Sequence, residues 1–377
     1  MGRPVFTHAD RRYLKLALDL ARSARGRTSP NPMVGAVVVR GERIVGRGHH
    51  ARAGAPHAEA MALQRAGSRA RGARLYLNLE PCCHAGRTPP CTDAILAAGI
   101  VEVVACMRDP DPRVNGGGFR ALRRAGLRVR VGCLAPEARR LNEGFVRFQR
   151  TGSPFVTLKA GMTLDGRIAT RRGESRWITS PAARAEARRL RARHDAVMVG
   201  VGTVLRDDPT LRAPGAGTAR VVLDSRLRTP PRARLLRDAR RAPVLVMTRP
   251  GAPGARRRRL ERAGAIVIEV ARAGTRVDLE AALGELGRRG VTSVLIEGGG
   301  EVLGSALDAR VGHRVALFVA PCLFGGRQAT AAFGGRGTAR LRNAARLRDA
   351  IVRRVGRDML IEARLEHPRD GRAGGAD

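Results

Sequence analysis

The stretch from residue 57 to residue 91 contains the side chains best suited to bind a metal ion. His57 offers an imidazole, and Cys82 and Cys91 offer two thiolates. One histidine and two cysteines can bind zinc and leave a fourth position open for water, which is typical of a catalytic zinc site. Zinc lowers the pKa of its bound water from about 15.7 to about 7, so the pattern predicts a hydroxide at neutral pH.

Glu59 follows the candidate histidine by two residues and is not itself needed as a ligand. A carboxylate placed there can carry protons to and from a reacting group. A His-x-Glu segment followed by Pro-Cys and a further Cys is the arrangement of zinc-dependent nucleobase deaminases. The pattern therefore predicts hydrolytic removal of an exocyclic amine.

Eight residues, Cys83 to Pro90, separate the two candidate thiolates, whereas polynucleotide deaminases usually have two. This insertion predicts a different pocket wall beside the metal. Cys83 and His84 could also bind metal in principle. Because adjacent cysteines do not easily face one ion, we prefer Cys82, which directly follows Pro81.

The elements around these residues alternate between strands and helices. Strands are expected at 36–39, 43–48, 73–79, 101–106 and 127–131, and helices at 7–25, 57–66, 92–98 and 119–125. Thr7 is the expected N-cap of the first helix and Gly67 the end of the second. A site at strand ends in such an alternation indicates a three-layer α/β domain. For Asn31, before the first strand, the pattern favours a turn residue over a ligand contact.

A second α/β domain is expected beyond the turn-rich residues 149–154, which are the best candidate boundary. Its strands are predicted at 155–160, 196–200, 219–224, 243–248, 265–270 and 293–297, and its helices at 181–193, 256–263 and 278–289, with Ser180 as an N-cap. We place the domains at 1–150 and 154–366 and expect residues 367–377 to be disordered. Cys106, Cys133 and Cys322 lie in apolar runs and are expected to be core residues.

The net charge of +38 comes from basic residues spread along the whole chain, of which only Lys15 and Lys159 are lysines. Without clustering, and with 3% aromatic residues for base stacking, nucleic acid is not favoured as a partner. Six cysteines without a regular framework, and no secretory leader, predict a cytoplasmic protein. No apolar run approaches the ~20 residues needed to cross a membrane.

Two features of the second half leave alternatives open. Lys159 is one of two lysines among 71 basic residues. Either this position needs a compact, rotatable ammonium, or the lysine remains there by chance and has no role. Glu297 is followed by three glycines, which could let backbone amides approach a phosphate or could serve a tight turn.

With these residues identified, the chain from about residue 8 to residue 366 resembles the bifunctional riboflavin-biosynthesis deaminase/reductase family. In the first half the resemblance rests on Pro30-Asn31-Pro32-x-Val34-Gly35, His57-Ala58-Glu59 and Glu80-Pro81-Cys82-x-His84-x-Gly86-Arg87-Thr88-Pro89-Pro90-Cys91. In the second half it rests on Leu158-Lys159, Leu164-Asp165-Gly166-Arg167, Gly173-Glu174-Ser175-x-Trp177-Ile178-Thr179-Ser180, Gly202-Thr203-Val204, Asp207-Asp208-Pro209 and Glu297-Gly298-Gly299.

The resemblance implies a cytidine-deaminase-like first domain and a dihydrofolate-reductase-like second domain that act in sequence. A diaminopyrimidinone with a phosphoribosylamino group would lose its ring amine at the zinc site, and NADPH would then reduce the ribosyl group to ribityl. In the first domain it implies Glu59 as the proton donor, a substrate contact at Asn31, and His57, Cys82 and Cys91 as zinc ligands.

In the second domain the resemblance implies Lys159 as a catalytic residue near the reacting sugar. The implied NADPH contacts are Gly161, Trp177, Thr203, Asp207, Ser225, Gly299, Gly300, Glu301, Val302, Leu303, Gly304 and Ser305. The implied substrate contacts are Ser175, Arg191, Leu211 and Glu297, with Arg191 suited to the substrate phosphate. The pattern alone would favour a core position for Trp177. The family usually has an Arg three positions after Leu211, whereas this chain reads Arg212-Ala213-Pro214. Arg212 could take over that phosphate contact from a shifted loop, so the role is not transferred.

Two other functions are compatible with parts of the sequence. The first is an RNA-base zinc deaminase with a C-terminal binding domain, favoured by the charge and disfavoured by the spacing of the thiolates. The second is a structural zinc module, disfavoured by the presence of only three good ligands. The expected partners are small phosphoribosylated pyrimidines, and we expect a homo-oligomer.

Overall fold

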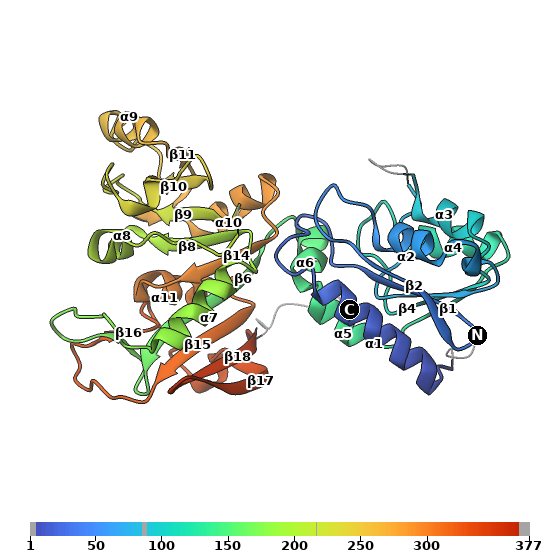
Figure 1. Cartoon of the computed structure of the whole chain (residues 1–377). Coiled ribbons are helices and arrows are strands. Elements are labelled where there is room, and N and C mark those ends of the chain that lie inside the picture. The colour runs from blue at the N-terminus through green and yellow to red at the C-terminus, as the bar shows by residue number, and fades with distance from the viewer. Residues whose placement is uncertain (1–4, 85–88, 216, 369–377) are drawn as a thin grey trace. The chain divides into compact units, whose positions relative to one another are not determined.

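The computed structural model describes residues 5–84, 89–215 and 217–368 (Figure 1). The chain divides into two compact units, Met1–Gly152 and Ser153–Asp377. Each unit has its own main sheet, with a hydrophobic core on either face of it.

The sheet of the first unit has five strands in the order β2-β1-β3-β4-β5. These are β1 (Gly35–Arg40), β2 (Arg43–His49), β3 (Arg74–Leu77), β4 (Glu102–Ala105) and β5 (Arg128–Val131). β1 is antiparallel to β2 and β3, whereas β3, β4 and β5 are parallel. The start of β1 and the carboxyl ends of the parallel strands therefore lie at one edge of the sheet.

Helices cover both faces of this sheet and complete the predicted three layers. They are α1 (His8–Arg22), α2 (Ala58–Ala66), α3 (Cys91–Ala97), α4 (Gly117–Arg124), α5 (Ala135–Leu141) and α6 (Glu143–Thr151), with a 3₁₀ turn at Gly67–Ala70. One core contains residues of α1, α5 and α6, and the other contains residues of α2, α3 and α4. Thr7 caps α1 through a reciprocal capping box with Asp10, as predicted.

The second unit contains a nine-stranded sheet in the order β11-β10-β9-β8-β14-β6-β15-β18-β17. Its strands are β6 (Phe155–Thr163), β8 (Ala196–Gly200), β9 (Ala219–Leu223), β10 (Val244–Thr248), β11 (Ile266–Glu269), β14 (Ser293–Glu297), β15 (Arg314–Ala320), β17 (Arg346–Val355) and β18 (Asp358–Glu366). The strands from β11 to β15 in that order are parallel, and β18 and β17 add antiparallel pairs.

Helices also cover both faces of the larger sheet. They are α7 (Pro181–Arg191), α8 (Val201–Asp207), α9 (Gly254–Arg262), α10 (Leu279–Arg288) and α11 (Gly300–Asp308). One core includes residues of α10 and α11, and the other includes residues of α7, α8 and α9. Short elements complete the unit: β7 (Arg167–Ala169), β12 (Arg272–Ala273), β13 (Arg276–Val277), β16 (Thr330–Ala331), and 3₁₀ turns at Arg234–Leu236 and Leu341–Asn343.

Several expectations need correction. The turn expected at 149–154 is only partly a turn, because α6 continues through Thr151 and ends at Gly152 in the left-handed region. Cys106 and Cys133 are buried as expected, but Cys322 is only half-buried. His367 is described and hydrogen-bonds the carbonyl of Gly312 at 2.8 Å, while residues 369–377 of the expected tail lie outside the described residues. None of the helices in the described ranges is long and apolar enough to cross a membrane.

Candidate active sites

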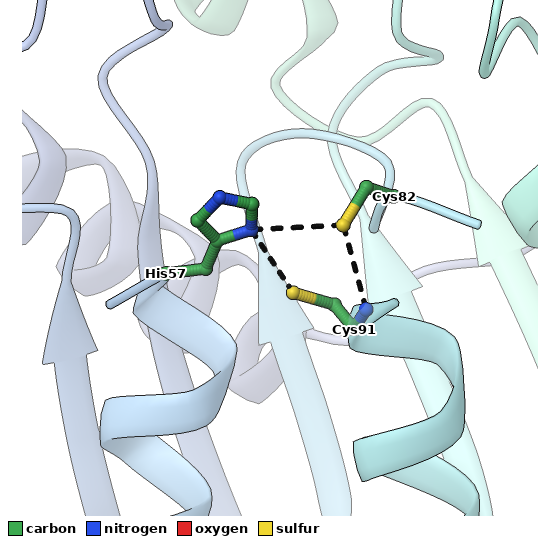
Figure 2. Close-up of side chains that lie close together, drawn as sticks. All are labelled: His57, Cys82 and Cys91. Atoms are coloured by element: carbon green, nitrogen blue, oxygen red, sulfur yellow. Dashed lines mark hydrogen bonds between the residues drawn. The ribbon is translucent and has the colours of Figure 1, made fainter. Parts of the chain in front are cut away.

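Three segments of the chain bring His57, Cys82 and Cys91 together at the edge of the first sheet where β1 begins and the parallel strands end (Figure 2). His57 immediately precedes α2, Cys82 lies in the loop after β3, and Cys91 begins α3. Nδ1 of His57 lies 3.2 Å from Sγ of Cys91 and 3.6 Å from Sγ of Cys82. All three donor atoms lie within 4.8 Å of one another, which fits ligands about 2.0–2.3 Å from a single zinc ion.

The surroundings of Cys82 favour its thiolate. Its Sγ accepts a hydrogen bond from the backbone amide of Cys91 at 3.4 Å, at the start of α3. Together with the side chains of Cys91 and His57, this keeps the pKa of Cys82 well below its usual value. Cys82 is therefore held in the thiolate form in which cysteine binds zinc, whereas the hydrogen bond with Cys82 and burial raise the pKa of Cys91.

Glu59 lies in the first turn of α2 and is 3% exposed. Burial raises the pKa of Glu59 to about 7. It lines the same cavity, of about 580 Å³, as His57 and Cys82. A carboxyl group with this pKa can take up and release a proton near neutral pH.

Asn31 lies on the wall of this cavity and also closes a turn, through its backbone amide and the carbonyl of Thr28. Its Nδ2 lies 3.1 Å from Nε2 of His50, whose Nδ1 faces the carbonyl of Pro56 at 3.2 Å. Burial lowers the pKa of His50, which favours the neutral ring. Because the carbonyl of Pro56 can only accept, Nδ1 donates to it and Nε2 is left to accept from Asn31. The sequence pattern did not identify His50, because it lies two residues beyond the predicted strand 43–48 and belongs to none of the motifs.

Glu80 fixes the loop that carries Cys82. Its buried carboxylate accepts hydrogen bonds from the backbone amides of Asp109, Gly116 and Phe119 at 2.9–3.1 Å. A Cβ on Gly118 would lie 2.1 Å from the carbonyl of Pro81, so only glycine allows this close packing. These contacts hold the segment just before Cys82 against the start of α4.

The group of converging metal donors contains Cys82 and not Cys83, whose Sγ lies 4.0 Å from the carbonyl of Arg113. His84 lines the cavity, and within the described ranges its buried Nδ1 has no hydrogen-bond partner. Gly86, Arg87 and Thr88, which belong to the motif of the resemblance, lie outside the described residues.

In the second unit, Lys159 of β6 stands directly opposite Glu297 of β14 in the parallel register. Nζ of Lys159 lies 3.8 Å from Oε2 of Glu297, and Arg191 makes two hydrogen bonds of 2.8 Å to the same carboxylate. Burial opposes ionisation of Glu297, but the two cations outweigh it and lower the pKa of Glu297 to about 2. The carboxylate therefore fixes two positive groups at the end of β14.

A cavity of about 530 Å³ opens over this pair. Of the residues implied by the resemblance, Lys159, Gly161, Ser175, Trp177, Arg191, Thr203, Asp207, Leu211, Glu297, Gly299 and Leu303 line it. Gly298 and Gly299 have φ of 76° and 72°, so this strand-to-helix turn requires glycine. The core position that the pattern alone favours for Trp177 is wrong, because Trp177 is 65% exposed and Arg184 lies 4.2 Å from its ring centroid.

Six residues implied as cofactor contacts are not in the lining of this cavity: Ser225, Gly300, Glu301, Val302, Gly304 and Ser305. Gly300 and Gly304 pack against the backbone of 331 and 334, where a Cβ would lie 2.4 and 2.1 Å from a carbonyl oxygen. Glu301 is exposed and paired with Arg276 at 2.9 Å. Ser225 lies just beyond the carboxyl end of β9.

The contacts of Arg191 differ from the substrate-phosphate contact that the resemblance implied for it. Arg191 uses its guanidinium on Glu297 and on the carbonyl of Arg212 at 3.1 Å, and Arg212 pairs with Asp238 at 2.8 Å. Arg184, Arg188 and Arg234 also line the cavity and were not singled out from the sequence. In an arginine-rich chain, only the tertiary structure separates such residues from those on solvated faces.

The two sites define a protein that joins a zinc-dependent deaminase to a reductase with a largely parallel sheet. Residues 7–107 match the cytidine and deoxycytidylate deaminase zinc-binding region, and residues 154–361 match the RibD C-terminal domain. The chain belongs to the RibD family of riboflavin biosynthesis, whose members are deaminases and reductases, with zinc and NADPH as the cofactors.

The similarity extends over almost the whole chain. Riboflavin biosynthesis protein RibD of Bacillus amyloliquefaciens is 41% identical to this chain, and the match covers 96% of this chain and 97% of the relative. Riboflavin biosynthesis protein RibD of Escherichia coli K12 is 39% identical, and the match covers 93% of this chain and 98% of the relative. Acinetobacter baumannii RibD, form 1, has a TM-score of 0.85 and 34% identity, covering 95% of this chain and 99% of that one. The Thermotoga maritima structure has a TM-score of 0.83 and 35% identity, with the same coverage. These matches do not favour an RNA-base deaminase.

Proposed function

We propose that the protein converts 2,5-diamino-6-(5-phosphoribosylamino)pyrimidin-4(3H)-one in two steps. The first domain removes a ring amine by hydrolysis, and the second uses NADPH to reduce the ribosyl group of 5-amino-6-(5-phosphoribosylamino)uracil to ribityl. The Thermotoga maritima relative is described as a deaminase and reductase for these compounds. The observation that carries the proposal is the convergence of His57, Cys82 and Cys91 beside the buried Glu59.

In the deamination step, zinc held by His57, Cys82 and Cys91 would supply an activated water. Glu59 would accept the proton released when the water oxygen bonds to the ring carbon. It would then return a proton to the amine nitrogen as the C–N bond breaks and ammonia leaves. Its pKa of about 7 suits both transfers at neutral pH.

Asn31 would orient the pyrimidine ring. Because Nδ2 of Asn31 donates to Nε2 of the neutral His50, Oδ1 is left to accept a hydrogen bond from the substrate. His50 is in turn fixed through Nδ1 by the carbonyl of Pro56. This pair would position the base without taking part in proton transfer.

In the reduction step, NADPH would supply a hydride to the sugar. Lys159 would hold a donor proton at a sugar oxygen, because its ammonium has more N–H groups than its contact with Glu297 requires. Glu297 and Ser175 would contact the substrate, as would the backbone at Leu211. Arg191 would act mainly by fixing the Glu297 carboxylate. NADPH would lie along Gly161, Trp177, Thr203, Asp207, Ser225 and residues 299–305.

We place the deaminase at 1–150 and the reductase at 154–366, and we propose a homo-oligomer in the cytoplasm. The division into compact units after Gly152 supports the boundary. All six cysteines are free, which fits a reducing compartment. Ile351 and Val352 on the edge strand β17 are 63% and 60% exposed, and a second copy would cover them. Sedimentation of the protein and of the Ile351→Glu variant tests the assembly, because a monomeric wild-type protein would refute it.

A coupled assay tests the proposed function. Purified protein is given the diaminopyrimidinone and NADPH, and ammonia release and NADPH absorbance are followed with and without a zinc chelator. Ammonia release followed by NADPH consumption, with both lost after chelation, is the expected result. Ammonia release without NADPH consumption would refute the second step, and the absence of both would refute the whole assignment.

A further inference from the structure

The first unit contains another cavity, beside α4, which we call the α4 cavity. Its volume is about 250 Å³, and it is lined by Arg108, Gly116, Phe119, Arg120, Arg123 and Val131. Among the residues that the structure describes, these six do not line the cavity that contains Glu59. Three of the six are arginines and the others are uncharged, so the walls of the α4 cavity are strongly positive.

Gly116 lets two of these guanidinium groups come close together. Its φ is 87°, which favours glycine. A Cβ at this position would lie 3.1 Å from Nη1 of Arg120 and 3.3 Å from Cζ of Arg108, so both groups lie beside the same glycine. Arg123 follows Arg120 by one turn of α4, and its Nη2 donates to the carbonyl of Val129 at 3.2 Å. That hydrogen bond fixes the third guanidinium at the cavity.

The charge of these three arginines is not balanced by an ion pair within the described ranges. The ion pairs of the first unit are made by other arginines, namely Arg22, Arg74, Arg113 and Arg130. The carboxylate of Glu80 lies near Gly116, but it is buried and already accepts hydrogen bonds from three backbone amides. Because neighbouring positive groups repel one another, a bound anion would stabilise this arrangement.

We infer that Arg108, Arg120 and Arg123 form a binding site for a diphosphate group. A guanidinium binds phosphate oxygens through parallel, charge-assisted hydrogen bonds. Three such groups match a ligand with several negative charges, spread over two phosphorus atoms, better than they match a single phosphate. The α4 cavity has room for a diphosphate and is too small to enclose a complete nucleotide.

Two ligands share this chemistry. One is inorganic pyrophosphate, and the other is the diphosphate end of a nucleotide whose nucleoside lies outside the cavity. The site is a further one, beyond the proposed function, and depends on neither of the two proposed reactions.

The α4 cavity is linked to the segment that carries a zinc ligand. The backbone amides of Gly116 and Phe119 donate to the carboxylate of Glu80 at 2.9 and 3.0 Å, and Glu80 precedes Cys82 by two residues. A diphosphate that held Arg108 and Arg120 together would therefore also restrain this segment. It would do so without occupying the cavity beside Glu59.

The test is calorimetric titration of the full-length protein with inorganic pyrophosphate, inorganic phosphate and ADP at constant ionic strength. Arg120→Gln and Arg123→Gln are compared with Arg124→Gln, which removes the same charge from α4 but does not line the cavity. Loss of charge-assisted hydrogen bonds should weaken pyrophosphate binding at least about tenfold in the first two variants. Arg124→Gln should bind like the wild type, and inorganic phosphate should bind at least about tenfold more weakly than pyrophosphate.

Hydrogen exchange of the wild-type protein locates the bound ligand. Amides within residues 108–124 should exchange more slowly when pyrophosphate is present. Unchanged exchange in this segment would show that pyrophosphate binds elsewhere and would contradict the inference. The unfolding midpoint without ligand should be the same in the wild type and the three variants, because the substituted side chains are exposed.

The ligands separate the two sources of diphosphate. ADP binding that is as tight as pyrophosphate binding, and is weakened by the same two variants, would identify a nucleotide, whereas binding of pyrophosphate alone would identify the free anion. If the wild type bound no pyrophosphate, or if Arg124→Gln weakened binding as much as Arg120→Gln, the inference would be wrong. Equal affinity for phosphate and pyrophosphate would also refute a diphosphate site.

Discussion

Lys159 and Glu297 stand directly opposite each other on neighbouring parallel strands, with Nζ 3.8 Å from Oε2. Arg191 holds the same carboxylate through two hydrogen bonds of 2.8 Å. This arrangement places a rotatable ammonium on the wall of the second cavity, beside a buried carboxylate. It gives a physical reason for a lysine at this position in a chain with only one other lysine, Lys15.

Replacing Lys159 with alanine should damage only the reduction. NADPH-dependent turnover should fall at least about a hundredfold, because a positioned proton donor is lost. Ammonia release should be unchanged, since Lys159 belongs to the other compact unit. Lys15→Ala is the matched control, because Lys15 is the other lysine and is exposed on α1. Wild-type reductase turnover in Lys159→Ala would remove this residue from the site.

Glu59→Ala should abolish deamination and keep zinc. The carboxylate carries protons and is not among the converging metal donors, so ammonia release should fall at least about a hundredfold while the zinc content stays at the wild-type level. Metal analysis and ammonia assays on the same preparation provide the measurement, with Glu42→Ala on the surface as the control. Loss of zinc from Glu59→Ala would contradict its assigned role.

The adjacent cysteines should behave differently. Cys82→Ser should lose zinc and ammonia release, because Cys82 belongs to the converging donors. Cys83→Ser should keep both, since its sulfur lies by the carbonyl of Arg113. Zinc content and reductase turnover are measured for both variants, and the reductase should be unaffected in each. Equal zinc loss from both variants would argue against the choice of Cys82 over Cys83.

His194 should make the second domain less stable in mild acid. Its ring nitrogens face the carbonyl of Leu190 and the hydroxyl of Thr157, each at 2.9 Å. Loss of hydration lowers the pKa of His194 from 6.5 to about 4. Below pH 6.5 the unfolded chain therefore binds a proton that the folded domain refuses, so the free energy of unfolding falls as the pH falls from 6.5 towards 4.

Calorimetric unfolding between pH 4 and pH 7 tests this. The unfolding midpoint of the second domain should depend less on pH in His194→Gln than in the wild type, whereas His8→Gln on the surface should leave the dependence unchanged. Identical pH dependence in His194→Gln and the wild type would show that another group is responsible.

The parts of the fold that could be predicted are those encoded locally. Thr7 and Ser180 cap their helices through their own side chains, so both helix starts were predictable. β17 was missed because nearly all of its residues are exposed and give no alternating pattern of burial. α6 was not predicted, because Gly152 and Pro154 indicate a turn over 149–154, whereas the turn begins only after Thr151.

The same distinction applies to the sites. The metal donors and Glu59 lie in two short motifs whose residue types carry the chemistry, so their convergence could be expected before the fold was known. His50 carries no such signal, because its contact with Asn31 depends on how the end of β2 meets the loop before β1. Arg184 and Arg188 likewise carry no sequence signal, because only the fold places them on the wall of the second cavity.

The central claim is that two separate sites act one after the other. It is tested most directly by mass spectrometry of the products formed from the diaminopyrimidinone and NADPH by Glu59→Ala, by Lys159→Ala and by a mixture of the two variants. Glu59→Ala should leave the substrate unchanged, Lys159→Ala should accumulate the deaminated ribosyl compound, and the mixture should form the ribityl product. If Lys159→Ala also failed to deaminate, or if the mixture formed no ribityl product, the account of two sites in series would be contradicted.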